Sequence, residues 1–252
     1  MSETDKSLAS FGYRDVPAED KPALVREVFS SVAGRYDLMN DLMSAGVHRV
    51  WKDLFVDWLN PQPGMRFLDV AGGTGDIARR IAERVRARSS APEVIVCDIN
   101  AAMLSHGVAR SGAHAGDIAW LCGDAESLPV RESSQDAYTI AFGIRNVTHI
   151  EKALSEAYRV LAPGGRFLCL EFSKVNAPGL DRLYDLYSFT VLPRLGEAVA
   201  GDGAAYRYLA ESIRRFPGQN KFARMIAGAG FSQVKVRNLS GGIAAMHSAW
   251  KA

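Results

Sequence analysis

Cysteine is scarce in this chain, and its cysteines are not spaced for a disulfide framework. Cys97, Cys122 and Cys169 are the three cysteines among 252 residues, and they lie far apart. Each stands in a short apolar run of the kind that forms a buried strand. We therefore expect three buried free thiols in a reducing compartment. Neither a CxxC nor an HxxxH pattern occurs, so the sequence predicts no metal site.

Long apolar runs and an excess of one charge are also lacking. No stretch is long enough to cross a bilayer, and the polar first residues do not have the pattern of a secretion signal. We expect a soluble, cytoplasmic protein, with a contact at the inner face of the membrane left open. The 30 lysines and arginines balance 28 aspartates and glutamates, which predicts no nucleic-acid partner.

What the chain does contain is an alternation of short apolar runs with amphipathic helical stretches. A flexible tail (1–20) and a helical lead-in over the active site (21–60) are predicted to precede the main domain (61–252), which carries a helical cap insertion at about 174–219. Strands are predicted at 67–71, 94–97, 118–122, 137–142 and 166–172, and helices at 76–88, 101–110, 150–161 and 221–229. This alternation predicts an α/β fold with a mostly parallel sheet. Two last runs, 231–239 and 243–250, predict a closing hairpin.

Residues 66–78 combine a predicted strand, a glycine turn and the start of a helix. Gly72, Gly73 and Gly75 let the backbone turn sharply and approach a ligand without an intervening Cβ. Asp69 lies near the carboxyl end of the strand, where open α/β sheets bind ligands, and it would attract a cationic group. The alternative is a glycine turn that serves only helix-sheet packing.

The same turn also satisfies the dinucleotide pattern GxGxxG/A, with Asp98 at the expected distance. Asp98 would accept hydrogen bonds from the ribose of either a nicotinamide or a methyl-donor cofactor, or it would serve a helix cap. Asp124, after the third strand, offers an acid near an adenine amino group. Together with the turn at Pro163-Gly-Gly165, Asp124 favours methyl transfer over a nicotinamide-dependent oxidoreductase.

Several unlike segments in one order make a resemblance specific. They are Val28-Phe-Ser-Ser-Val-Ala-Gly-Arg-Tyr-Asp-Leu-Met-Asn40, Leu68-Asp-Val-Ala-Gly-Gly-Thr-Gly75, Ala141-Phe-Gly-Ile-Arg-Asn-Val147, Leu170-Glu-Phe-Ser173 and Ser212-Ile-Arg-Arg-Phe-Pro217. The chain resembles class I methyltransferases and, more narrowly, the ubiquinone/menaquinone biosynthesis C-methyltransferase family. The resemblance implies a Rossmann-like fold whose seven-stranded sheet has helices on both faces and an antiparallel C-terminal strand. It also implies methyl transfer from S-adenosylmethionine to a ring carbon of a polyprenylated benzoquinol or of demethylmenaquinol.

The family's cofactor positions carry over to Thr74, Asp98, Asp124 and Ala125. With Asp69, Gly73 and Gly75 of the turn, and with Ala141, they are the expected cofactor contacts. Ala141 departs from the family, which often has serine there, so only a backbone contact is expected from it. A non-catalytic scaffold subunit is the alternative function, and the retained glycines and acids argue against it.

Arg145 and Asn146 are the candidates at the acceptor. Arg145 would stabilise a phenolate by charge-assisted hydrogen bonds, with a salt bridge at a strand end as its alternative role. Asn146 would orient water or a substrate oxygen, or cap the helix near His149. Tyr36 and Asp37, in the lead-in, would reach over the pocket to bind or accept a proton, or would serve packing and capping.

The aromatic cap is the natural place for a prenyl tail, because aromatic walls bury apolar area efficiently. A peripheral membrane contact follows as a hypothesis. The alternative is that these aromatic side chains form the core of the cap itself or a homodimer interface. A quinone-synthesis complex is a further partner that the sequence leaves open.

Overall fold

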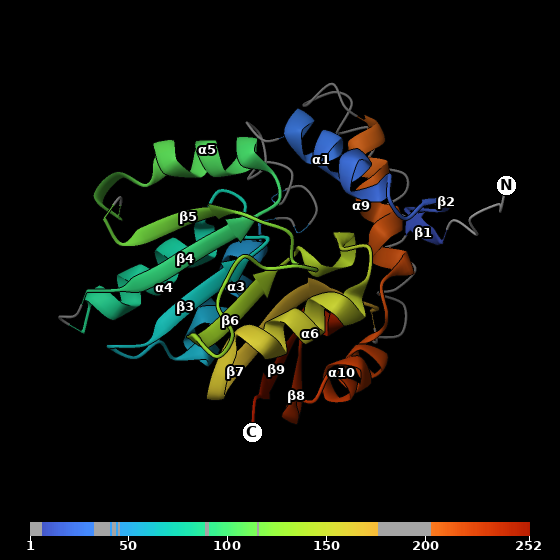
Figure 1. The fold of residues 1–252 in the computed structure, drawn as a ribbon. Helices are drawn as coiled ribbons and strands as arrows, with labels where there is room; N and C mark the ends of the chain where they lie inside the picture. The colour runs from blue at the N-terminus through green and yellow to red at the C-terminus, as the bar shows by residue number, and fades with distance from the viewer. Residues whose placement is uncertain are drawn as a thin grey trace, which may run out of the picture.

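A seven-stranded sheet forms the centre of the computed structural model, which describes residues 7–32, 41, 44, 46–88, 91–114, 116–175 and 203–252 (Figure 1). Its strands are β3 (Arg66–Val70), β4 (Glu93–Asp98), β5 (Ile118–Cys122), β6 (Gln135–Ala141), β7 (Leu161–Phe172), β8 (Ser232–Leu239) and β9 (Ala244–Trp250). The order is β5-β4-β3-β6-β7-β9-β8. Pairs from β5 to β7 are parallel, whereas β9 is antiparallel to both of its neighbours. The predicted mostly parallel sheet with an antiparallel C-terminal strand is confirmed.

Helices cover both faces of this sheet. They are α3 (His48–Leu59), α4 (Asp76–Arg86), α5 (Ala101–Arg110), α6 (Ile150–Val160) and α10 (Gln219–Gly228). Phe67 of β3 belongs to the core formed with α3 and α4, whereas its neighbour Leu68 belongs to the core formed with α6 and α10. Successive strand residues point to opposite faces, and the last four residues of β3 are buried because helices cover both of its faces.

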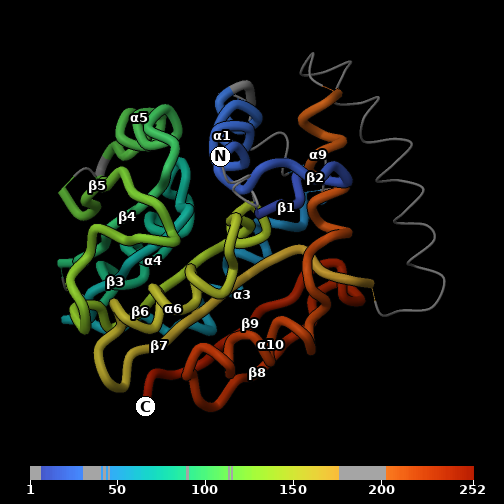
Figure 2. The backbone as a smooth tube through the Cα atoms, turned by 45° about the vertical axis from the view of Figure 1, so that its right-hand side comes forward, coloured from blue at the N-terminus to red at the C-terminus, as the bar shows by residue number. Residues whose placement is uncertain are grey.

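The N-terminal residues form a hairpin where the sequence predicts a flexible tail. Strands β1 (Leu8–Phe11) and β2 (Arg14–Pro17) pair antiparallel. The ring of Phe11 stacks on Tyr208 of α9 (Gly203–Arg215), with 4.3 Å between the ring centroids. Helix α1 (Lys21–Val32) packs against both α9 and β1 (Figure 2). Because α9 is distant in sequence from β1, the polar local pattern of these N-terminal residues does not predict that they form an ordered hairpin.

The described part of the predicted cap belongs to the core. Tyr206, Tyr208 and Leu209 of α9 are all buried in the cluster that also contains Val25 of α1. The described aromatic side chains of the cap thus pack in the main core of the protein, with α1 and the sheet, and not in a separate core of the cap. Most of the insertion, residues 176–202, lies outside the described residues.

Two of the three cysteines have the predicted environment. Cys97 and Cys169 are buried, and burial raises the pKa of both thiols, that of Cys97 to about 12. The prediction of a buried thiol is wrong for Cys122, which is exposed. Cys122 is the last residue of β5, an edge strand, and among the described residues no further strand lies beside it. Within the described ranges, no helix is both long and apolar enough to cross a membrane.

Two helical glycines should respond oppositely to substitution by alanine. A Cβ at Gly107 of α5 would lie 2.4 Å from the Trp120 ring, whereas a Cβ at Gly228 of α10 would meet nothing within 4 Å. We expect Gly107→Ala to lower the free energy of unfolding by about 1–3 kcal/mol through overpacking. Gly228→Ala should raise it by about 0.5–1 kcal/mol, because alanine loses less backbone freedom on folding. Urea denaturation measures both, and equal shifts in one direction would contradict the packing at Trp120.

Candidate functional site

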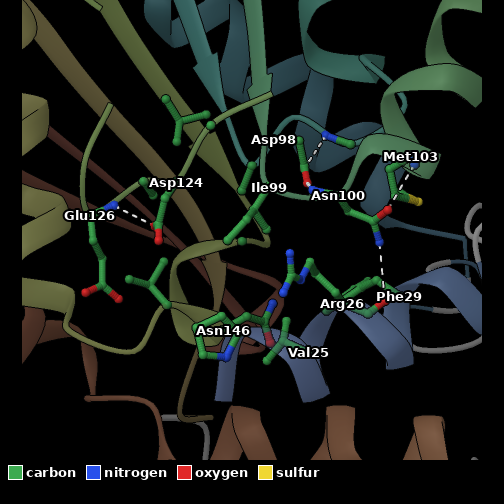
Figure 3. A pocket seen from close by; sticks show the side chains of 18 of the residues that line it. Val25, Arg26, Phe29, Asp98, Ile99, Asn100, Met103, Asp124, Glu126 and Asn146 are labelled. Carbon is green, nitrogen blue, oxygen red and sulfur yellow. Dashed lines mark hydrogen bonds between the residues drawn. The ribbon is translucent and has the colours of Figure 1, made fainter. Parts of the chain in front are cut away.

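A pocket opens at the carboxyl ends of the parallel strands and is covered by α1 (Figure 3). It encloses about 800 Å³, including space open to solvent, within the range of small-molecule sites. Val25, Arg26 and Phe29 line it from α1. The second described helix of the lead-in, α3, packs instead against α4 and β7. Only α1 of the two therefore lines the pocket.

The glycine turn forms one wall of the pocket and has a backbone that most residues adopt only with strain. Gly73 and Gly75 have φ of 56° and 77°, and the Gly75 amide donates to the Gly72 carbonyl at 2.8 Å. A Cβ at Gly75 would lie 2.5 Å from the Trp120 ring. Ala71, with φ of 49°, adopts the left-handed conformation that costs a non-glycine residue about 1–2 kcal/mol.

Asp98 links this turn to the next strand. Its Oδ2 accepts from the Gly73 amide at 2.9 Å, and its Oδ1 accepts from the Asn100 amide at 2.8 Å. Burial raises the pKa of Asp98, and these two hydrogen bonds oppose the rise. The side chain lines the pocket and keeps lone pairs that can accept from a ribose diol. The helix cap is Asn100, whose Oδ1 accepts from the Ala102 and Met103 amides, so Asp98 is left for the pocket.

Asp124 and Ala125 line the pocket beyond the end of β5. Asp124 Oδ1 accepts from the Glu126 amide at 2.9 Å. Glu126 Oε1 in turn accepts from the Thr148 and His149 amides, each at 2.9 Å. Glu126, rather than Asn146, therefore satisfies the amides before α6.

Asp69 is buried directly before the lining residues Val70 and Ala71 and does not itself line the pocket. Its Oδ1 accepts from Thr139 Oγ1 at 2.8 Å, whereas its Oδ2 has no hydrogen-bond partner among the described residues. Burial raises the pKa of Asp69 to about 7, with the charges of Asp76 and Asp98 adding to the rise and Thr139 opposing it. A buried carboxylate that lacks part of its hydrogen bonds is stabilised by a nearby positive charge. The site therefore fits a cofactor that carries a cationic sulfonium and an amino group.

Asn146 lines the opposite side of the pocket, in η3 (Ile144–Asn146). Its Oδ1 accepts from the Tyr208 hydroxyl at 3.0 Å, which leaves the amide donors of Asn146 for a ligand. Burial raises the pKa of Tyr208, so this tyrosine stays a protonated donor at neutral pH. Asn146 is thus the predicted acceptor residue whose side chain the structure brings to the pocket.

Arg145 is buried and paired. Its Nη1 donates to Glu171 Oε1 and to the Phe142 carbonyl, both at 2.6 Å. Its Nε has no hydrogen-bond partner among the described residues. Arg145 does not line the pocket, and the salt bridge expected as its alternative role is present.

The remaining predicted residues lie at the edge of the site or outside the described part. Thr74 and Gly75 form the buried side of the turn, and Ala141 ends β6 directly before the lining residues Phe142 and Gly143. Tyr36 and Asp37 belong to residues that the structure does not describe. No cluster of three metal-binding side chains occurs in the described ranges.

The sequence predicts a lead-in over the active site, but not which of its side chains line the pocket. The side chain of Arg26 rises from α1 into the pocket (Figure 3) and is the one lysine or arginine among the described lining residues. The spacing of Val25 and Phe29 marks one face of a helix. That spacing does not indicate which part of the protein the helix face contacts, because the strand ends that it covers are distant in sequence.

Comparisons with known proteins agree with this arrangement. A model of the ubiE/COQ5 methyltransferase family matches residues 15–251. The mitochondrial 2-methoxy-6-polyprenyl-1,4-benzoquinol methylase of Oryza sativa subsp. japonica is 57% identical, over 96% of this chain and 88% of its own. The ubiquinone/menaquinone biosynthesis C-methyltransferase UbiE of Dinoroseobacter shibae is 54% identical over the full length of both chains. A solved SAM-dependent methyltransferase from Thermotoga maritima shares the fold, with a TM-score of 0.60 at 21% identity, over 90% of this chain and 99% of its own. The chain therefore belongs to the ubiE/COQ5 methyltransferase family, whose members use S-adenosylmethionine as methyl donor.

Proposed function

We propose that this enzyme methylates a ring carbon of a polyprenylated benzoquinol, of demethylmenaquinol, or of both, in ubiquinone or menaquinone biosynthesis. The observation that carries the proposal is one pocket lined both by Asp98 and Asp124, on the cofactor side, and by Asn146, on the acceptor side. The names of the two relatives support the class of acceptor. We propose that the methyl donor and the ring bind side by side in this one pocket.

S-adenosylmethionine, when bound, supplies an activated methyl group. The chain's own part is to hold the acceptor carbon in line with it, and such orientation supplies roughly 7 to 11 kcal/mol. Two sides of the pocket restrict the ring: α1 through Val25 and Phe29, and the strand end through Phe142 and Val147. Phe142 is also held by the packing of its ring on Phe172, 4.8 Å away.

Asn146 and Arg145 are proposed to favour the phenolate form of the ring. The Asn146 amide, oriented by Tyr208, donates to the ring oxygen beside the reacting carbon. Arg145, which does not line the pocket, contributes through its positive charge. An arginine stays protonated in proteins, so the proton leaves through a water or through another group. Tyr36 and Asp37 stay predictions for that proton acceptor.

The prenyl tail requires apolar walls. We propose that its first units pack on Val25, Phe29 and Phe142, since each buried methylene contributes about 0.8 kcal/mol. The membrane contact and the homodimer remain predictions for the cap at about 174–219, of which residues 176–202 lie outside the described part of the chain.

Methyl transfer from labelled S-adenosylmethionine tests the proposal, with benzoquinol and demethylmenaquinol supplied in turn as reduced and as oxidised rings. We expect label in the reduced acceptors only, because attack by a ring carbon needs the electron density of the quinol. Transfer to neither quinol, with cofactor binding intact, would overturn the proposed substrate class.

A further inference from the structure

A buried lysine is paired with the residue that follows the cofactor turn. This lysine belongs to none of the sequence motifs on which the proposed function depends. Lys52 of α3 has a side chain that is 4% exposed, and its Nζ donates to Asp76 Oδ2 at 2.8 Å. Asp76 is the first residue of α4 and follows Gly75 of the turn. A buried charge is costly unless it is paired, so this contact joins α3 to the cofactor turn by a strong interaction.

The second partner of this contact is a carboxylate that stays charged. Burial alone would raise the pKa of Asp76, but the charge and hydrogen bond of Lys52, together with Arg80 and Arg79, hold it at about 2. Arg80 Nε donates to the other oxygen, Asp76 Oδ1, at 3.2 Å. Asp76 is therefore a permanent negative charge beside the cofactor turn.

Asp69 is influenced by charges from every element packed around it. Asp76 of α4 and Asp98 of β4 disfavour its ionised form, whereas Lys52 of α3 and the hydroxyl of Thr139 on β6 favour it. Three carboxylates thus surround one turn, and Lys52 is the buried cation that offsets them. His48, one helical turn before Lys52, has its pKa lowered by burial and by the charge of Lys52, so it adds no positive charge at neutral pH.

We propose that Lys52 is a positioning residue for the cofactor: by neutralising Asp76, it leaves Asp69 ionised to attract the cationic methionine end of S-adenosylmethionine. Lys52 touches neither cofactor nor acceptor and acts through the two aspartates. The inference rests on the cofactor and on the role proposed for Asp69, and it is independent of the acceptor.

Calorimetric titration of the whole protein with S-adenosylmethionine, without any acceptor, tests this inference. For Lys52→Met we expect the affinity for S-adenosylmethionine to be about ten-fold weaker near neutral pH. This corresponds to an upward shift of about one pH unit in the midpoint of the pH dependence of binding. The difference in affinity between the variant and the wild type should narrow as the pH rises, because Asp69 then ionises in the variant as well. Ratios of variant to wild-type Kd, taken at one pH, cancel the ionisation of the cofactor itself.

Two further variants separate this electrostatic role from mere support of the fold. Lys52→Met combined with Asp76→Asn should recover affinity, because the charge that Lys52 offsets is then absent. Lys52→Arg should keep wild-type affinity. Arg84→Gln is the matched control: Arg84 also joins α4 to α3, through Asp57 and Asp53, but away from the turn, and its loss should leave affinity unchanged.

Three results would overturn the inference. Lys52→Met binding as tightly as wild type at every pH is the first, and a folded double variant that stays as weak as Lys52→Met is the second. The third is Asp69→Asn binding like wild type with an unchanged pH profile, since Lys52 would then have nothing to act through. A failure of the proposed acceptor would appear differently, as intact cofactor binding without methyl transfer to a quinol.

Discussion

Asp69→Asn is expected to weaken S-adenosylmethionine binding and, at the same time, to stabilise the protein without ligand. Asp69 is buried, one of its oxygens has no partner among the described residues, and its pKa rises to about 7 in the folded chain from an unperturbed 3.8. The folded state therefore holds a proton that the unfolded state releases between these values, so stability falls as pH rises through this window. At pH values above this window, the ionised Asp69 lowers the free energy of unfolding by up to about 4 kcal/mol. Asparagine carries no charge and avoids this loss.

Urea denaturation at about pH 5.5 and about pH 8 measures this cost, and calorimetry measures the affinity. The stabilisation by Asp69→Asn should be larger at the higher pH. Asp136→Asn is the control with the opposite sign, because hydrogen bonds from Arg66 lower the pKa of Asp136, so its loss destabilises at neutral pH. A ligand-free Asp69→Asn protein that is less stable than wild type at both pH values would contradict the account.

Arg145→Met is expected to lower the free energy of unfolding by about 3–5 kcal/mol, because it leaves Glu171 as a buried charge without its partner. Both side chains are almost fully buried, and 2.6 Å separates Arg145 Nη1 from Glu171 Oε1. Burial raises the pKa of Glu171, and Arg145 opposes that rise. Adding Glu171→Gln should recover most of the stability, which chemical denaturation measures.

The same double variant separates the structural role of Arg145 from a catalytic one. If Arg145 stabilises the phenolate, the folded double variant keeps its affinity for S-adenosylmethionine and loses kcat. Asn146→Ala, which removes the neighbouring acceptor contact, provides the comparison. Full turnover in the folded double variant would remove Arg145 from the mechanism and leave it only the ion pair with Glu171.

The cofactor turn can be predicted from sequence because its chemistry is local. Gly73 and Gly75 adopt positive φ values that the motif itself implies, and Asp98 follows at the distance that one helix and one strand span. The alternation of apolar runs also predicts β3, β4, β5 and β6, although the run of β5, at the edge of the sheet, is only partly buried.

The acceptor side of the site resists such prediction because its contacts are long-range. Arg145 of η3 has a partner in Glu171, on β7, and Asn146 has one in Tyr208, on α9. Polar residues near a strand end are compatible with either a salt bridge or a ligand contact, and only the partner decides between them. Lys52 is hidden for the same reason, since nothing in the pattern of α3 indicates Asp76.

The position of the new methyl group distinguishes carbon methylation of a quinol ring from methylation of its hydroxyl groups. S-adenosylmethionine with an isotope-labelled methyl group, purified enzyme and a reduced polyprenylated acceptor would yield a product for nuclear magnetic resonance. Carbon methylation should give a labelled methyl signal from a group bonded to a ring carbon, and the hydroxyl groups should be unchanged. A labelled methoxy signal, or no labelled product from either quinol, would contradict it.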